Sequence, residues 1–337
     1  MGGTRPAKHA DGLWYTNDGK ELQDQLARWL AAVNPPAEQG FTPPINGCRA
    51  IIAPHAGYSY SGPAAAWAYK SIDTTDIERV FILGPSHNVY LNRCDLSGCD
   101  DYATPLGNLK IDVETINKLV ETTSKFGKMS MKTDRDEHSI EMHLPYLRHI
   151  FRDREIKLVP ILVGAINKEK EVEYGELLAE YLGKPENFFV ISSDFCHWGT
   201  RFDYTLYYPE PLPSDVDAVR LRSYGPSPQN LSKRPIHTSI SDLDHEAMDI
   251  LTLPPRSPTS SPAAEEAHTK FSVYLNRTKN TICGRHPIGV LLGALAYLEK
   301  SSGVKTKMEW VRYEQSSKCQ YIRDSSVSYA SAYITFL

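Results

Sequence analysis

The chain has 337 residues, of which 41% are hydrophobic, so it can bury a full core as one large domain or two ordinary ones. Its 37 basic and 41 acidic residues give a formal net charge of -4 without a long run of like charge, which argues against nucleic acid and anionic lipid as partners. The sequence lacks an apolar signal-peptide core and a membrane span of roughly 18 to 20 apolar residues. We therefore expect a cytoplasmic protein, with the nucleus as a second location.

Short β-rich runs alternate along the chain with longer amphipathic segments, an order typical of βαβ units. In chain order we predict a helix at 18–33, a strand at 50–54, a helix from Pro63, strands at 80–84 and 156–164, a helix at 168–182, a strand at 188–193, a helix at 287–298, and strands at 307–313 and 327–336. This order predicts an α/β fold with a central mixed or parallel sheet flanked by helices.

One stretch differs in composition from the rest of the chain. Ten of the 23 prolines lie between Pro209 and Pro262, mixed with Ser, Thr and Asp, around one predicted helix at 241–253. We therefore predict proline-rich surface loops or insertions at 209–236 and 254–264. No internal repeat and no other change of composition marks a second domain, so we predict a single domain over 1–337.

The cysteines do not form a disulfide or zinc-finger pattern. All of them are scattered, without CxxC spacing, which indicates reduced thiols that mostly fill the core. They are Cys48, Cys94, Cys99, Cys196, Cys283 and Cys319. A functional role for any one of them therefore needs a local reason.

Histidines follow the carboxyl ends of two predicted buried strands. His55 lies in IIAPHAGYSY and His87 lies in FILGPSHN. After a third strand, in FFVISSDFCHWG, Asp194, Cys196 and His197 leave the sheet together. Open α/β sheets bind ligands at this edge, so we expect these side chains to gather in one pocket.

A cysteine lies in the turn before the predicted helix at 287–298. In NTICGRHPIGV, Cys283 and His286 precede Pro287, and the helix start would favour a thiolate or a bound anion. Each histidine alone could simply hydrogen-bond a turn, and Cys283 alone could be an inert core residue. Together, His55, His87 and Cys283 form a ligand set typical of transition metals, with positions left open for water or substrate.

The segment DRDEHSIEMHLPYLRHIF resembles a zinc-binding helix only superficially. The HExxH signature places two histidines four residues apart, whereas His138 and His143 are five apart and would point about 140° from each other on a helix. Glu137 and Glu141, or His138 and Glu141, would share a helix face. We expect a structural role, or one in which Glu141 or His138 orients a metal-binding imidazole.

A hydrolase-like site is an alternative that the spacing leaves open, with Cys283 as nucleophile and His55, His87 or His197 as base. Other enzyme classes are disfavoured. No GxSxG elbow, Walker loop or GxGxxG fingerprint occurs where a predicted strand meets a helix, which argues against serine hydrolases, P-loop NTPases and dinucleotide-dependent oxidoreductases.

Seven motifs together identify a family resemblance. They are IIAPHAGYSYSG, FILGPSHN, DEHSIEMHLPYL, LVPILVGA, SSDFCHWG, NTICGRHPIGVLL and DSSVSYA. In this order, from about Thr4 to Phe336, they resemble the Memo family, the mediator of ErbB2-driven cell motility and its fungal relatives. The resemblance implies the fold of the class III extradiol dioxygenases, in which two His and one Glu hold a non-haem iron that binds catechol and oxygen.

Carried over to this sequence, the resemblance implies His55 and His87 as metal ligands, Cys283 as the third ligand, His197 as the acid/base residue and Asp194 beside the same pocket. A thiolate in place of Glu makes the site softer, suited to iron, copper or zinc, and exposes an oxidisable sulfur, which argues against ring cleavage. The family implies iron or copper binding in intracellular redox and metal homeostasis, together with signalling to cell motility or growth morphology.

Competing functions remain open for this pocket. The first is a metal-dependent redox protein, in which His197 moves protons. The second is a signalling adaptor that binds a phosphotyrosine peptide in the same pocket without a metal and without turnover, as family members have been proposed to do. Arg285, His286 and the helix start at Pro287 would then recognise the phosphate. A purely structural scaffold would leave the polar strand ends unexplained.

Overall fold

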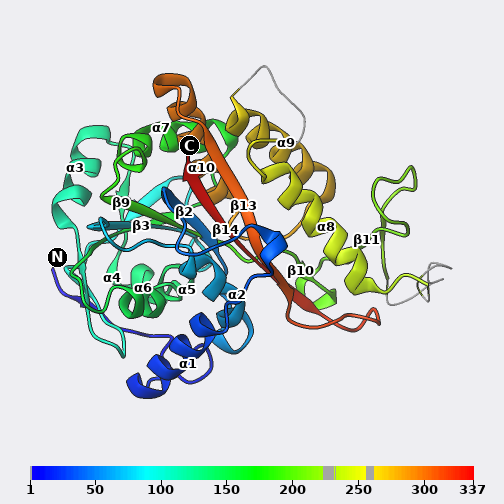
Figure 1. Ribbon diagram of the computed structural model, residues 1–337, viewed down its shortest axis with the longest axis horizontal. Helices are drawn as coiled ribbons and strands as arrows, with labels where there is room; N and C mark the ends of the chain where they lie inside the picture. Colours follow the sequence, from blue (N-terminus) through cyan, green and yellow to red (C-terminus); the bar gives the residue numbers. More distant parts are fainter. Residues whose placement is uncertain (1, 223–230, 232, 256–261) are drawn as a thin grey trace.

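The computed structural model describes residues 2–222, 231, 233–255 and 262–337, and one large sheet runs through it (Figure 1). Its centre consists of parallel strands, and antiparallel strands extend it on both sides. The parallel strands are β2 (Cys48–Ala53), β3 (Arg79–Pro85), β8 (Lys157–Val163) and β9 (Asn187–Ser192). The two long closing strands are β13 (Thr306–Gln315) and β14 (Ser326–Phe336).

Short strands complete the edges of this sheet. They are β1 (Thr4–Arg5), β4 (Cys94–Leu96), β5 (Asp101–Tyr102), β6 (Leu109–Ile111), β7 (Gly127–Lys128) and β10 (His197–Trp198). The order across the sheet is β1-β5-β6-β8-β3-β9-β2-β14-β10, while β13 pairs with β14, and β4 pairs with β7 and β8. Two further strands, β11 (Leu206–Tyr207) and β12 (Val219–Arg220), form a separate antiparallel pair.

In the part of the chain that the structure describes, helices flank the sheet. They are α1 (Gly19–Ala31), α2 (Tyr58–Lys70), α3 (Val113–Thr123), α4 (Met131–Asp136), α5 (His138–Glu141), α6 (Leu144–Ile150), α7 (Lys168–Leu182), α8 (Ile236–Leu251), α9 (Ala263–Thr278) and α10 (Arg285–Ser302), with 3-10 turns at Ala37–Gln39 and Thr200–Phe202. α2 packs on β2 and β14, and α10 packs on α7, α9 and the strands β3 and β9. None of the described helices is long and apolar enough to cross a bilayer.

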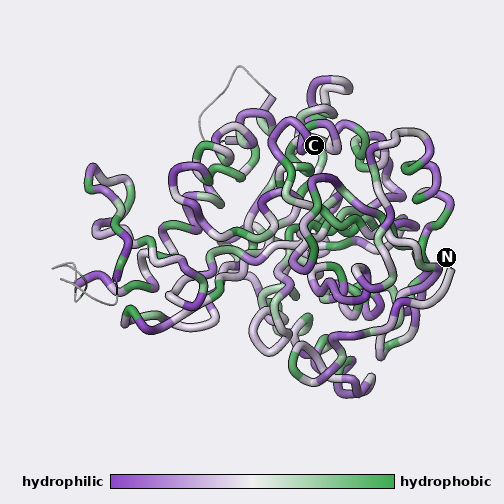
Figure 2. The backbone as a smooth tube through the Cα atoms, turned by 180° about the vertical axis from the view of Figure 1, so that it is seen from behind, coloured by the Kyte–Doolittle hydropathy of each residue, from purple (hydrophilic) through white to green (hydrophobic). Residues whose placement is uncertain are grey.

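The central strands are buried because helices cover the sheet. Figure 2 shows hydrophobic segments gathered in the interior, with hydrophilic ones around them. Every residue of β9 is buried, and so is every residue of β3 after Arg79. Such continuous apolar runs are typical of parallel strands that are covered on both faces.

The helices α7 and α10 approach each other closely through glycines. A Cβ atom at Gly175 would lie 2.5 Å from the backbone nitrogen of Ala294, and one at Gly293 would lie 2.9 Å from the carbonyl oxygen of Glu171. Larger side chains would force the helices apart. This contact fixes α10, and therefore the turn that precedes it, against the sheet.

The predicted α/β fold with a mixed central sheet flanked by helices is confirmed. Two predicted helix starts are wrong. α2 begins at Tyr58, whose N–H donates to the carbonyl of Trp14, and Pro63 lies inside the helix. α10 begins at Arg285 rather than Pro287, because the Gly284 carbonyl already accepts the Ile288 N–H.

The proline-rich predictions fall partly outside the described residues, namely at 223–230, 232 and 256–261. Inside the predicted loop 209–236, Val219–Arg220 forms β12. Inside the predicted loop 254–264, α9 starts at Ala263. The predicted helix at 241–253 starts earlier, at Ile236, because Pro235 sets the extended residue before its first turn.

Candidate metal centre

Three parallel strands end at one edge of the sheet and bring the predicted side chains together. β9 pairs with β2 on one side and with β3 on the other. His55 follows β2, His87 follows β3 and Asp194 follows β9, and all three line one cavity of about 540 Å³. Other side chains that line this cavity are Trp14, Tyr60, His138, His197, Arg201 and Tyr329.

Two of these imidazoles and one thiol form a potential metal-ligand set. One ligand atom each from His55, His87 and Cys283 lies within 4.8 Å of the others. The sulfur of Cys283 is 3.1 Å from Nε2 of His55, and the ring centroids of His55 and His87 are 5.2 Å apart. His55 and His87 therefore lie at the strand ends where they were predicted, and Cys283 reaches them from the turn before α10.

The tautomer of His55 follows from its hydrogen bonds. Its Nδ1 lies 2.6 Å from the hydroxyl oxygen of Ser192, and that hydroxyl donates its only proton to the carbonyl of Ser139 at 2.7 Å. Nδ1 must therefore donate, which leaves Nε2 unprotonated and next to Cys283. Burial, together with neighbouring imidazoles, lowers the pKa of His55 well below its ordinary value and keeps the ring neutral.

A carboxylate fixes the ring of His87. Glu137 accepts hydrogen bonds from Nδ1 of His87 at 2.9 Å, from its backbone N–H at 2.7 Å and from the N–H of Ser139 at 3.0 Å. Burial opposes the charge on Glu137, but the bonds from His87 prevail and lower its pKa to about 2. Such a carboxylate–histidine pair holds Nε2 as the free ligand atom. Of the two residues predicted for such a role, Glu141 does not contact a ligand imidazole, whereas His138 contacts His87 by stacking on its ring.

His197 also presents Nε2 to the cavity. Its Nδ1 lies 3.0 Å from the carbonyl oxygen of Phe195 and 3.2 Å from that of Thr281, and a carbonyl can only accept. Nδ1 therefore carries the proton, and Nε2 can take up another. Asp194 accepts from the backbone N–H groups of His55 and Ala56, so it fixes the turn after β2, and burial raises its pKa.

The turn before α10 brings Cys283 onto the end of β9. The N–H of Asp194 donates to the sulfur of Cys283 at 3.2 Å, and the N–H of Gly284 donates to the hydroxyl oxygen of Ser193 at 3.1 Å. A Cβ at Gly284 would collide with Ser193, so only glycine permits this approach. Burial raises the pKa of the Cys283 thiol well above its ordinary value. The backbone N–H groups of Asp194 and Gly284 act in the opposite direction, as expected for the helix start, but desolvation is the larger effect.

His138 forms a second layer behind the ligand set. Its ring stacks on His87 with centroids 4.3 Å apart, and the indole of Trp14 covers its other side at 4.5 Å. Burial lowers the pKa of His138 to about 3, so the ring is neutral. One ligand atom each from His87, Glu137 and His138 also lies within 4.8 Å of the others.

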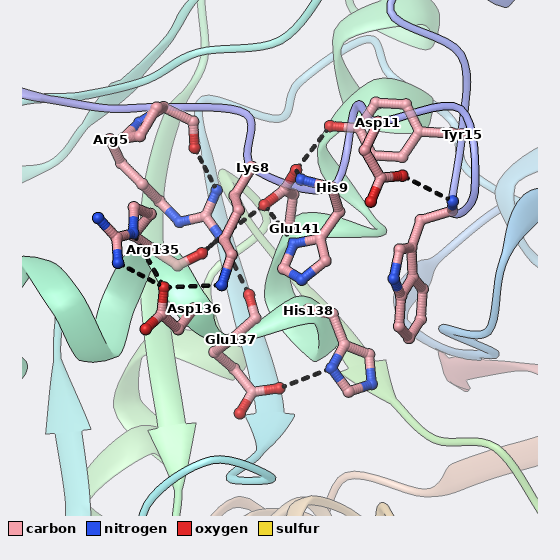
Figure 3. A network of polar contacts seen from close by, with 12 residues as sticks. Arg5, Lys8, His9, Asp11, Tyr15, Arg135, Asp136, Glu137, His138 and Glu141 are labelled. Atoms are coloured by element: carbon pink, nitrogen blue, oxygen red, sulfur yellow. Dashed lines mark hydrogen bonds and ion pairs between the residues drawn. The ribbon is translucent and has the colours of Figure 1, made fainter.

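Glu141 holds the N-terminal segment rather than an imidazole of the ligand set (Figure 3). Its carboxylate accepts hydrogen bonds from Nδ1 and from the backbone N–H of His9, each at 2.8 Å, and from the hydroxyl of Tyr15 at 2.7 Å. It also forms a salt bridge with Arg5 at 2.8 Å. These bonds fix the segment that carries Trp14 across the mouth of the cavity.

Comparison with known proteins gives the family. The family profile described as "Memo-like protein" matches residues 5–333. This chain belongs to the Memo family. Protein MEMO1 of Rattus norvegicus is 46% identical over 98% of this chain and 97% of its own length, and that of Homo sapiens is 45% identical over the same shares. A solved structure of an uncharacterized protein from Escherichia coli K12 aligns with a TM-score of 0.47 and 12% identity, over 84% of this chain and 99% of that chain.

Two predicted residues of this Memo protein lie outside the cavity. Arg285 and His286 line a different cavity, next to Glu171, and Nδ1 of His286 lies 2.6 Å from that carboxylate. The prediction that they recognise an anion in the same pocket as His55 was therefore wrong.

The sequence did not predict several residues that shape the cavity of His55 and His87. They are Trp14, Ser192 and Tyr329, although Ser192 lies in the motif SSDFCHWG and Tyr329 in DSSVSYA. A polar residue at the end of an otherwise apolar strand, as in VISSD, is a usable signal for Ser192. The role of Trp14 depends on a contact with His138, which is distant in the sequence, and no local pattern indicates it.

Proposed function

We propose that this Memo protein binds a redox-active metal ion, iron or copper, through His55, His87 and Cys283. The observation that supports this most is that ligand atoms from three separate turns lie within 4.8 Å of one another. Both imidazoles are already in the tautomer that a metal needs, because Ser192 and Glu137 hold their Nδ1 atoms.

The chemistry of the donor set fits such an ion. Imidazoles suit iron, copper and zinc, and a thiolate favours the softer of these. Since the thiol of Cys283 is neutral without a positive partner, metal binding would release its proton. A bound ion would supply Lewis acidity and electron transfer, with positions left for water or substrate.

The chain's own residues supply proton transfer and shape. Nε2 of His197 faces the cavity while Phe195 and Thr281 fix the ring, so His197 can accept or deliver a proton there. Tyr60 and Tyr329 give the cavity an aromatic wall. An oxidisable sulfur at Cys283 argues against ring cleavage, so we propose redox or metal-handling chemistry instead.

Metal analysis tests this proposal. Protein purified without chelators should contain about one iron or copper per chain, because the two candidate ligand groups among the described residues share His87. Changing both His55 and Cys283 to Ala should abolish this, whereas Cys48→Ala, outside the cavity, should not. Anomalous scattering should locate the ion beside Nε2 of His55. Metal-free wild-type protein, or an unchanged metal content in the double variant, would refute the proposal.

We further propose that the metal serves intracellular redox and metal homeostasis, and through it signalling to cell motility or growth morphology. The similarity to proteins named MEMO1 supports the signalling part of this assignment. Cells without this protein should regain normal iron content and morphology with the wild-type chain, and should not with the variant in which His55 and Cys283 are Ala. Equal rescue by the wild-type chain and by this variant would contradict the proposal.

One observation favours a second candidate function, the binding of phosphotyrosine. Arg201 lines the cavity, and its guanidinium lies 4.4 Å from the ring of Phe202, so a cation and an aromatic wall stand together. A phosphorylated peptide should then bind more tightly than its unphosphorylated form, and Arg201→Gln should remove the difference. Equal affinities of the two peptides would exclude this function.

A further inference from the structure

A second cavity lies where α7, α9 and α10 meet, separate from the metal site. Its volume is about 530 Å³, which lies within the usual range for small-molecule sites. It shares no lining residue with the cavity of His55 and His87. A ligand bound here would therefore not compete with the metal.

The lining of this cavity carries an excess of positive charge. Lys168, Lys279 and Arg285 line it, and Glu171 is its one lining carboxylate. Lys168 donates to the hydroxyl of Thr269, and Arg285 donates to a backbone carbonyl. Within the described ranges of the chain, none of these three cations forms a salt bridge. Their charge is therefore available to a ligand.

Glu171 offsets only one of these three positive charges, and its oxygens already accept hydrogen bonds from two imidazoles. Nε2 of His268 and Nδ1 of His286 each lie 2.6 Å from one of its oxygens. Burial opposes ionisation, but these two bonds prevail and lower the pKa of Glu171, so it is a carboxylate held between two ring nitrogens. It orders the wall of the cavity while the cations stay unpaired.

One residue that lines the cavity has a buried acceptor without a donor. Asn280 is buried, and its amide nitrogen donates to Asp244 at 3.1 Å and to the hydroxyl of Tyr274 at 2.8 Å. Its amide oxygen has no partner among the described residues. A buried acceptor of this kind is expensive unless a hydroxyl or water donates to it.

We propose that this cavity binds a small organic phosphate that also carries hydroxyl groups. Lys279 and Arg285 would pair with the phosphate, because guanidinium and ammonium groups form strong charge-assisted hydrogen bonds with it. A ligand hydroxyl would donate to Asn280. The apolar side chains of Phe271 and Leu275 form the remaining wall and suit a carbon skeleton.

Calorimetric titration of the full-length protein tests this site, with ribose 5-phosphate as the probe. We expect saturable binding of the probe, weaker binding of inorganic phosphate and no binding of ribose. The double variant Lys279→Gln, Arg285→Gln should bind the probe about tenfold more weakly or worse, since one charge-assisted hydrogen bond is worth about that factor. The control Lys305→Gln, Arg323→Gln removes the same charge from exposed positions elsewhere and should bind normally.

Three results would overturn the proposal. They are no saturable binding of ribose 5-phosphate, an equal loss in the two double variants, and phosphate binding as tightly as ribose 5-phosphate. Thermal unfolding of each variant shows whether it is folded. A crystal soaked with ribose 5-phosphate gives a measurement that needs no variant, since phosphate density at Arg285 supports the site and density elsewhere contradicts it.

Discussion

Replacing Glu141 by Gln should destabilise the protein and release its N-terminal segment. Glu141 accepts three hydrogen bonds from His9 and Tyr15 and pairs with the buried guanidinium of Arg5. Gln keeps the volume but loses the charge and turns a nitrogen donor toward other donors. Removing one partner of a buried pair costs about 3–5 kcal/mol. Asp134 remains 3.2 Å from Arg5, so we expect the lower end of this range.

Urea denaturation at neutral pH measures that loss directly. Hydrogen exchange should accelerate in the segment that carries His9 and Trp14, because its anchor is gone. Asp136→Asn is the matched control, since Asp136 pairs with Lys8 of the same segment near the surface. Its effect should be much smaller. An unfolding free energy within about 0.5 kcal/mol of wild type for Glu141→Gln, with unchanged exchange, would refute the reasoning.

The same variant should also change the dependence of stability on pH. Burial opposes the charge on Glu141, but the bonds from His9 and the field of Arg5 prevail, and its folded pKa lies below the ordinary value. A group with a lowered folded pKa contributes stability fully above its unfolded pKa of about 4.3 and loses it as the pH falls further. The difference between wild type and Glu141→Gln should therefore be largest at neutral pH and shrink below pH 4 or so.

Three further substitutions test the site and the core. Glu137→Gln should weaken iron or copper binding by about 10- to 100-fold in a competition titration, because it removes the negative charge and one of the two acceptor oxygens that hold His87. Ser192→Ala should cost about 1–3 kcal/mol of unfolding free energy, because it leaves a buried imidazole nitrogen unpaired. Gly289→Ala should lower the thermal midpoint, since the added Cβ would collide with the carboxylate of Glu171; an unchanged midpoint would contradict this.

The ligand set was predictable because a simple rule of sheet geometry applies to it. His55 and His87 follow apolar runs, and parallel strands of that kind end at one edge of the sheet. The rule needs no knowledge of the neighbouring strand. It did not include Cys283, whose place depends on how α10 is fixed against α7 by glycines, and the family resemblance supplied that residue.

The supporting residues were harder to predict, because their roles depend on local breaks in the chain. The segment 134–151 was expected to be helical without a break, but three short helices span 131–150, and Glu137 lies at the break between α4 and α5. There its carboxylate caps Ser139 and reaches His87. On a continuous helix Glu137 and Glu141 would share a face, and the sequence could not separate their roles.

The sequence also could not predict that Arg285 lies outside the metal cavity. The predicted role of Arg285 depended on a helix that starts at Pro287. The helix starts two residues earlier, at Arg285, so Arg285 belongs to its first turn and faces a different direction from that expected of a residue before the helix. Arg285 then lines the cavity beside α9, a helix that lies next to the proline-rich part of the chain and was not predicted.

The distance along the chain between the proposed ligands has a consequence for biosynthesis. His55 and Cys283 are 228 residues apart, although the imidazole nitrogen and the sulfur are 3.1 Å apart in the folded protein. A ribosome must therefore synthesise most of the chain before the third ligand exists, and β2, β3 and β9 emerge well before it. Metal insertion would follow synthesis of these central strands rather than guide their pairing, and a chain truncated before Cys283 would lack the thiol that closes the site.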